Sequence, residues 1–297
     1  MTSRNARGSG PPVSESLREY GRGIAGGLLF SLPLLYTMEM WWAGIGVRPG
    51  RLIVYVLGTF VLLLGYNRYV GLRHDDSWRE VAIDSVEEMG LGLAVSVLVL
   101  FLLGRLTGSD SAYEMMGKII IEAMTVAIGV SVGTAQLGVL RHERLSGRGA
   151  PEMRGARPGK GKTDSGATWF GGQLVIGFCG AVLFAANIAP TEEIPMIAAQ
   201  TSAWRLVGLS LLSVALGGLI LYYSGFTGSD RHVSHGGVVN AVVGSVVTFA
   251  VGLVASALLL WFFGRFDGAS PVLMIAQTLV LAFVATLGAS AGRLLLQ

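Results

Sequence analysis

The stretch LVIGFCGAVLFAANIAPTEEIP (residues 174–195) combines two features that decide the fold. Its first part is an almost unbroken apolar run, and runs of about 20 such residues are typical of helices that cross a membrane. Its last part carries two adjacent acids, Glu192 and Glu193, between two helix breakers, Pro190 and Pro195. The stretch therefore predicts a membrane-spanning segment that holds acids and helix breakers, a combination that points to a function.

The whole chain has the composition of a membrane protein. Of its 297 residues, 52% are hydrophobic and 14% are charged, whereas soluble domains carry about 25% charged residues. Apolar runs without strict alternation exclude a membrane β-barrel. Each run is long enough to cross a hydrocarbon core about 30 Å thick, so we predict an all-α bundle of about eight transmembrane helices. The eight runs cover residues 24–47, 52–71, 82–104, 118–140, 168–194, 204–225, 237–264 and 270–293.

The basic residues predict the orientation of these segments. With the N-terminus in the cytoplasm, 16 Lys and Arg residues fall on the inner side and six on the outer side, as the positive-inside rule requires. We therefore expect a multi-pass protein with both termini inside, a disordered tail (1–22) and a flexible basic linker (141–167). The linker contains GKGKT but lacks the first glycine of a P-loop. We expect lipid near this linker, and no nucleic acid partner.

An internal repeat organises the membrane region. TMEM (37–40) matches TEEI (191–194), LLGRLTG (102–108) matches FFGRFDG (262–268), and GVSVG (129–133) matches GASAG (288–292). The offsets are 154, 160 and 159 residues. A looser match joins GYNRYVG (65–71) to YYSGFTG (222–228). The common order and near-constant spacing predict a duplicated unit.

The duplication divides the chain into two membrane repeats, residues 23–140 and 168–297. Four spans in each repeat would return the chain to its starting side, which favours parallel repeats about an axis along the membrane normal. An inverted arrangement of three plus three spans stays open, because the first segment of each repeat contains a proline and could be re-entrant.

Two glutamates occupy equivalent positions in the repeats, Glu39 in TMEM and Glu193 in TEEI. A preceding proline frees an upstream backbone carbonyl, which is tolerated in a membrane where it lines protein or a water-filled cavity. Carboxylates and carbonyls are ligands for hard cations, and a buried carboxyl can carry a proton. We therefore predict an ion- or proton-binding site from Glu39, Glu193, Glu192, Asn187, Thr37 and Thr191, beside helix breaks at Pro33, Pro190 and Pro195.

Other charged residues allow two interpretations each. Asp84, Glu87 and Glu88 share one helical face and form either a cytoplasmic ion entrance or acids that stabilise a helix start. Glu39 and Glu193 themselves could lie in the outer interface, and Glu192 could simply begin a solvated loop. Glu122 lies four residues after Lys118, so we expect these two to form a structural ion pair.

Two further groups of residues are candidates for a functional role. The repeated arginines, Arg105 and Arg265, are expected to extend to lipid headgroups, with a role as counter-charges to the acids as the alternative. His232 and His235 form H-x-x-H, but metal binding needs further ligands and none is evident nearby. The identity of any bound metal therefore stays open.

SLPLLYTMEMWW (31–42) and NIAPTEEIPMIA (187–198) resemble a bacterial family of integral membrane proteins without an assigned function. The resemblance extends over roughly residues 20–296, apart from the linker. It implies a polytopic protein of the bacterial inner membrane with an acidic motif in the first segment of each half. It implies no substrate and no catalytic residue.

Three functions compete at this point. The leading hypothesis is a cation transporter or channel, in which proton coupling would use the paired glutamates; a channel would commonly be a homo-oligomer. The alternative is a membrane scaffold or sensor whose basic linker binds lipid or a partner. A membrane-embedded enzyme would have only Asp84, Glu87 and Glu88 with His74 as its candidate residues, so we expect no enzyme and no cofactor.

Overall fold

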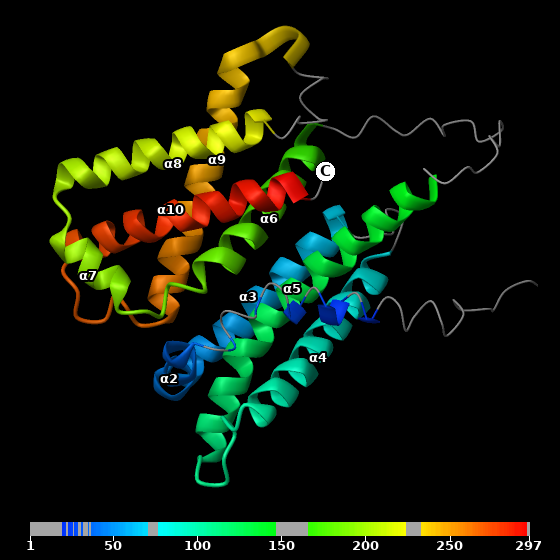
Figure 1. The fold of residues 1–297 in the computed structure, drawn as a ribbon, viewed down its shortest axis with the longest axis vertical. Coiled ribbons are helices and arrows are strands. Elements are labelled where there is room, and N and C mark those ends of the chain that lie inside the picture. Colours follow the sequence, from blue (N-terminus) through cyan, green and yellow to red (C-terminus); the bar gives the residue numbers. More distant parts are fainter. Residues whose placement is uncertain are drawn as a thin grey trace, which may run out of the picture.

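The computed structural model describes residues 37–70, 77–146, 166–223 and 233–295, with a few further residues between 20 and 35. All regular structure in these ranges is helical (Figure 1). The helices are α2 (Met38–Gly46), α3 (Pro49–Val70), α4 (Trp78–Leu102), α5 (Ala112–Ser146), α6 (Gly166–Ala185), α7 (Glu193–Gln200), α8 (Ala203–Tyr223), α9 (Val233–Phe262) and α10 (Pro271–Leu295).

In the part of the chain that the structure describes, six helices are long and apolar enough to cross a membrane: α3, α4, α5, α8, α9 and α10. The chain is therefore an integral membrane protein with several apolar helices, as predicted. The predicted number of eight spans is not established. In the first predicted segment (24–47), Pro33 and six other residues lie outside the described residues. The apolar part of α6, Gly171–Ala185, is shorter than the spanning helices.

The fifth predicted segment does not continue as one helix to residue 194. Helix α6 ends at Ala185, turns follow, and α7 begins at Glu193. Pro190 lies in the turns, as expected for a residue that cannot continue a helix. The prediction that Pro195 breaks a helix is wrong, because Pro195 is the third residue of α7. A proline is tolerated there, since the first-turn N–H groups of a helix have no intrahelical acceptor.

Helices α4 and α9 end in the same way, 160 residues apart. Gly104 and Gly264 adopt positive φ angles of 67° and 75°, a conformation that glycine adopts without steric cost. The next backbone N–H closes the turn in both cases: Arg105 donates to Leu100 at 2.8 Å, and Arg265 donates to Leu260 at 2.9 Å. These bonds satisfy carbonyls that the helix ends would otherwise leave bare.

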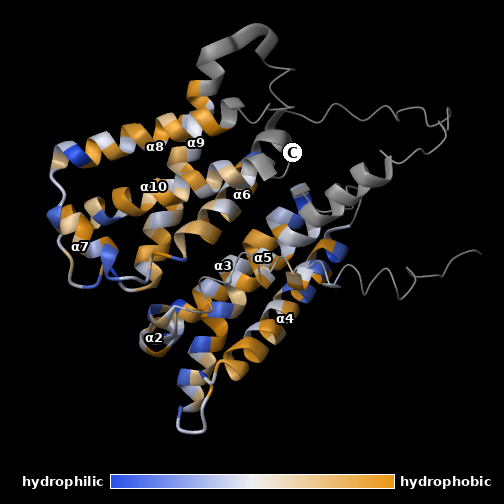
Figure 2. Ribbon diagram, viewed as in Figure 1, coloured by the Kyte–Doolittle hydropathy of each residue, from blue (hydrophilic) through white to orange (hydrophobic). Residues whose placement is uncertain are grey.

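The helices form two adjoining groups (Figure 1). In the first half (37–146), α5 packs against α2, α3 and α4. In the second half (166–295), α10 packs against α6, α7, α8 and α9. Helix α3 packs against α6 and joins the halves. Figure 2 shows that hydrophobic residues cover most of the long helices and that hydrophilic residues gather near helix ends and turns.

One end of the molecule, the loop end, contains α2, α7 and the turns at 103–111 and 263–270 (Figure 1). The opposite end, the linker end, contains the end of α5 and the start of α6. Helix α5 runs to Ser146, six residues into the stretch 141–167 that the sequence predicts to be a flexible linker. The remainder of that stretch up to residue 165, and most of the tail 1–22, lie outside the described residues.

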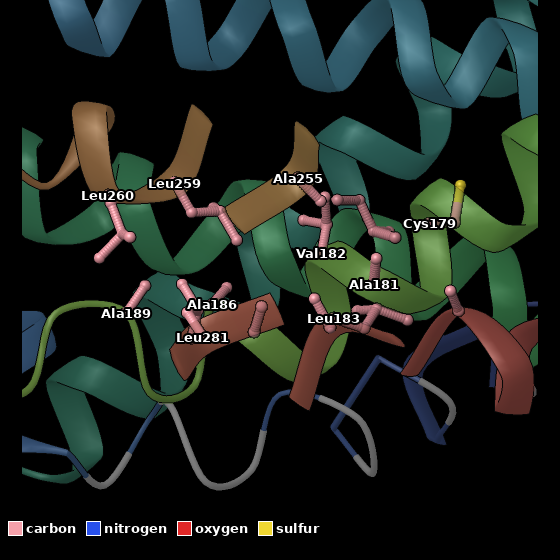
Figure 3. Close-up of a cluster of buried hydrophobic side chains, with 14 of the residues drawn as sticks. Cys179, Ala181, Val182, Leu183, Ala186, Ala189, Ala255, Leu259, Leu260 and Leu281 are labelled. Carbon is pink, nitrogen blue, oxygen red and sulfur yellow. The ribbon is translucent and has the colours of Figure 1, made fainter. Parts of the chain in front are cut away.

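The largest buried apolar cluster centres on small side chains of α6 (Figure 3). Ala181 and Val182 share this cluster with residues of α9 and α10, such as Ala255 and Leu281, and Cys179 lies at its edge. The same cluster includes Leu63, Ala127 and Ile128 from the first half, so one apolar core extends across both halves. Small residues let helix backbones approach closely in a membrane, where van der Waals packing stabilises helix association.

Glycines set the closest helix contacts. A Cβ atom at Gly288 of α10 would lie 2.7 Å from the Cβ of Phe184 in α6, and one at Gly180 would collide with the Gly288 carbonyl. In the first half, a Cβ atom at Gly92 of α4 would lie 2.6 Å from the Ala123 carbonyl of α5. The pattern GASAG (288–292), which the sequence presents as a repeat match, therefore lies at a helix crossing.

A bulky residue at the α6–α10 crossing should loosen the second half. We expect Gly288→Leu to lower the stability by about 1–3 kcal/mol, because overpacking forces the backbones apart. The measurement is thermal unfolding of the detergent-solubilised protein. Gly208→Ala is the control, because a Cβ atom there meets nothing within 4 Å. Equal unfolding temperatures for Gly288→Leu and the wild type would contradict the crossing.

Candidate functional site

The predicted acids at the loop end begin the two short helices. Thr37 is the N-cap residue of α2 and Glu39 lies in its first turn, half-buried. Glu192 is the N-cap residue of α7 and Glu193 lies in its first turn, exposed. Hydrogen bonding with Thr191 holds the pKa of Glu193 below its usual range, so this carboxylate is ionised at neutral pH. Acids at a helix start also interact favourably with the helix dipole.

The two acidic motifs belong to different halves. Helix α2 packs against α5, and α7 packs against α10. The proposal that Glu39 and Glu193 share one ion site therefore stays a prediction. Asn187 lies in the turns after α6, where its side-chain amide donates to the Leu183 carbonyl at 2.5 Å. This bond gives a partner to one backbone carbonyl at the end of α6.

Each of the two repeated arginines contacts the acidic motif or short helix of its own half. Arg265 donates to Glu192 Oε1 at 2.7 Å and to the Pro190 carbonyl. Arg105 lies over the ring of Trp41 in α2, 4.1 Å from its centroid, as in a cation–π pair. Arg265 is therefore the counter-charge of Glu192, which the sequence left as an alternative to headgroup contact.

The halves are joined at the loop end by Arg51 of α3. Its guanidinium donates to Asp267 Oδ1 at 2.6 Å and lies 5.4 Å from the ring centroid of Trp261. The hydrogen bond from Arg51 holds the pKa of Asp267 below its usual range. One turn further along α3, the ring of Tyr55 stacks on Phe262 with centroids 4.3 Å apart.

Glu122 of α5 is the most deeply buried acid of the described residues. Its side chain is 1% exposed, and neither carboxylate oxygen has a hydrogen-bond partner among them. The predicted ion pair with Lys118 is wrong, because Lys118 Nζ instead donates to Asp110 Oδ2 at 3.0 Å and to the Arg105 carbonyl at 3.2 Å. The Thr107 backbone N–H and Lys118 hold the pKa of Asp110 below its usual range.

A second polar group, here called the Glu88 cluster, consists of Asn67 of α3, Ser85 and Glu88 of α4, and Ser131 of α5. Asn67 Nδ2 donates to Glu88 Oε2 at 2.8 Å and to Ser85 Oγ at 3.1 Å. Ser131 Oγ donates to Asn67 Oδ1 at 3.0 Å. Glu88 and Asp84 are half-buried, whereas Glu87 is exposed. Of the predicted entrance residues, Glu88 therefore enters the bundle and Glu87 does not.

Glu88 and Glu122 approach the middle of the membrane from opposite ends. Each lies ten residues after the start of its helix, α4 or α5, which is about 15 Å at 1.5 Å per residue. Helix α4 starts at the linker end and α5 at the loop end. Two acids thus lie within the spanning helices of the first half, at depths where charged groups mark ion or proton pathways.

The described residues contain no group of three or more His, Cys, Asp and Glu side chains that could hold a metal ion. The side chains of His232 and His235 lie outside what the structure describes. The available oxygen ligands are single carboxylates, hydroxyls and an amide, a set better matched to a proton or a monovalent cation than to a divalent one.

Sequence reasoning missed Asn67, Ser131 and the role of Glu122. Asn67 and Ser131 lie within GYNRYVG and GVSVG, which the sequence presents only as repeat matches. A polar residue inside an apolar run is itself a signal, and it points to Asn67. The i, i+4 spacing of Lys118 and Glu122 is misleading, because it does not reveal that Asp110 folds back onto Lys118.

Replacing Glu122 should stabilise the protein. We expect Glu122→Leu to raise the stability by about 1–3 kcal/mol, because it removes a buried polar group without a partner. Thermal unfolding in detergent measures this, with the near-isosteric Glu122→Gln as the control that changes less. A loss of stability in Glu122→Leu would show that the carboxylate has a structural role.

The ion pair between the halves should depend on pH. The lowered pKa of Asp267 means that its contribution is present above the unfolded value, about 3.9, and is lost as the pH falls through the folded value. We expect Asp267→Asn to lower the unfolding temperature slightly at neutral pH and to have no effect at acid pH. In an Arg51→Gln background it should have no effect at either pH; an equal effect in that background would exclude the pair as the cause.

The chain can also be compared with known proteins and protein families. No curated protein and no solved structure matches the chain. A family of membrane proteins matches residues 19–296, which confirms the resemblance seen in the two acidic motifs. The chain therefore belongs to the family described as "Putative integral membrane protein (DUF2391)".

Proposed function

We propose that this protein is a cation transporter that moves a small cation, with protons as coupled or competing ions, through its first half. The observation that carries the proposal is Glu122, 1% exposed and without a partner for either oxygen in the described structure. A charged acid at the centre of a bilayer costs about 2.5–3.5 kcal/mol on insertion scales. A group that is kept at this cost without a structural partner is best explained by the binding and release of an ion.

Hydroxyl groups continue from Glu122 toward the linker end. Thr125 follows on α5, and its Oγ1 lies 2.9 Å from the hydroxyl of Tyr55. Ser96 of α4 is fully buried, and its hydroxyl has no partner among the described residues. It lies eight residues beyond Glu88, about 12 Å toward the loop end. Because Gly92 of α4 faces Ala123 and Ala127 of α5, Thr125 lies between the levels of the two acids and Ser96 lies near the level of Glu122. These side chains can bind or relay a cation or proton near the two acids.

The repeated geometry supports a duplicated, parallel bundle. The turns after α4 and α9 share their positive-φ glycines and hydrogen bonds. The starts of α5 and α10 also match, because Ser111 Oγ accepts from the Glu114 N–H at 3.2 Å and Ser270 Oγ accepts from the Leu273 N–H at 3.3 Å. A short helix before three long ones recurs in both halves, as expected for tandem repeats.

We infer from the positive-inside rule that the loop end lies outside and the linker end in the cytoplasm, because the basic residues of the linker and of both terminal segments favour the inner side. In this arrangement Thr37 and Glu39, with Thr191 and Glu193, attract cations at the outer surface. Asp84 and Glu88 face the cytoplasmic side, as the sequence hypothesis of an ion entrance requires. The path lies inside one copy of the chain, which favours a carrier over a channel formed by several copies.

The test uses the full chain in liposomes loaded with dyes for protons and for metal cations. We expect the wild type to carry a flux, and Glu122→Gln to lose at least about 90% of it, since a neutral amide neither ionises nor carries a proton. Gln277→Leu is the control, because Gln277 is equally buried but lies in the second half. A double variant, Glu39→Gln with Glu193→Gln, should mainly reduce the flux at low ion concentration.

Two results would contradict the proposal. A flux that persists in Glu122→Gln would show that this acid is not part of the ion path. A wild type that is silent for every cation at every pH would leave the alternative of a membrane scaffold or sensor, and would direct attention to partners of the basic linker.

A further inference from the structure

We propose that the Glu88 cluster is a binding site for a monovalent cation, sodium or lithium, for which protons compete. The site rests on the proposed function for its role in transport, but its binding chemistry can be tested without transport. Three properties support it: the lone pairs that the cluster presents, a buried hydroxyl within electrostatic range of Glu88, and the charge of the cluster.

The oxygens of the cluster come from three helices and converge on Asn67. Ser85 donates its proton to the Val81 carbonyl at 2.8 Å, so the lone pairs of Ser85 Oγ are directed to Asn67. Glu88 Oε2 lies 2.8 Å from Asn67 Nδ2, and Ser131 Oγ lies 3.0 Å from Asn67 Oδ1. Side chains of α3, α4 and α5 thus hold four polar groups within hydrogen-bond distance of their neighbours.

The Asn67 amide can turn either its NH₂ group or its oxygen toward Glu88 and Ser85. In the structure, its NH₂ group acts as the donor between Glu88 and Ser85. Rotation of the amide by half a turn exchanges Nδ2 for Oδ1, which has nearly the same shape and position. The Asn67 oxygen then joins those of Ser85 and Glu88, while Ser131 Oγ accepts from the NH₂ group and holds the amide in this orientation. Hard cations prefer such oxygen ligands.

Tyr66 provides an independent indication of a ligand. This side chain is 1% exposed, and its hydroxyl has no hydrogen-bond partner in the described part of the chain. It lies within electrostatic range of Glu88. Buried hydroxyl groups are normally paired, because an unpaired one keeps its desolvation cost. A cation bound at the cluster would attract the Tyr66 oxygen, which the described structure leaves without a hydrogen-bond partner.

The charge of the site selects a monovalent ion. Glu88 is the only acid of the cluster, and the titratable groups that act on it are Asp84 and Glu87 of α4, with Tyr66 of α3 and Cys179 of α6 close by. One carboxylate balances one positive charge, whereas calcium sites usually combine several. Protonation removes that charge, so the cation and the proton exclude each other, and cation affinity should rise with pH.

The experiment measures binding of radiolabelled sodium to the purified full chain in detergent, with unlabelled sodium, lithium and potassium as competitors. We expect saturable binding that increases with pH and is displaced by lithium. Glu88→Gln should weaken it at least tenfold, and Ser131→Ala should weaken it several-fold. Sodium should also raise the unfolding temperature of the wild type, but not of Glu88→Gln, because only a ligand of the folded state stabilises it.

Ser290→Ala is the matched control, because Ser290 lies 159 residues after Ser131 in α10 and donates to the Thr286 carbonyl of its own helix. It should bind sodium like the wild type. Absence of sodium binding at every pH, or full binding by Glu88→Gln, would overturn the assignment. Sodium binding without flux in liposomes would support the sodium site and contradict the transport proposal. Flux without sodium binding would support transport and contradict the sodium site.

Discussion

Inside a membrane, every polar group of the chain must find its partner within the protein, and this constraint governs the structure described above. Hydroxyls in the spanning helices satisfy it by donating to the carbonyl four residues earlier, as Thr248, Thr278 and Thr286 do. The turns after α4 and α9 satisfy it with backbone bonds around a positive-φ glycine. Against this background Glu122 stands out, because it is the only acid among the buried side chains of the described residues whose polar atoms lack a partner.

The halves differ in their polar residues far more than in their turns. Positions 159 or 160 residues after Glu88, Lys118 and Glu122 hold Thr248, Gln277 and Leu281. The second half thus has uncharged residues where the first half has acids and a base, and it packs α6, α9 and α10 around alanines and glycines. In the proposed function, the first half carries the ion and the densely packed second half supports it.

The sequence predicted the helical membrane architecture because apolar runs of that length are typical of membrane-spanning helices. It also predicted that Pro190 would interrupt a segment. It could not predict that Pro195 would be accommodated in the first turn of α7, because this depends on where the chain resumes its helix. The sequence also could not predict the neighbours of Glu122, because it is the turn at 103–111 that brings Asp110 to Lys118. Asn67 and Glu88, which are distant in the sequence, meet only because α3 and α4 pack side by side.

Gly92 sets the distance between the two acid-bearing helices of the first half. Helix α4 packs against α3 and α5, and at Gly92 it meets the α5 backbone without an intervening side chain. A side chain at position 92 would collide with that backbone, so this contact sets the separation of α4 and α5. Glu88 lies one turn before Gly92, and any change in this separation would therefore move its carboxylate relative to Glu122 of α5.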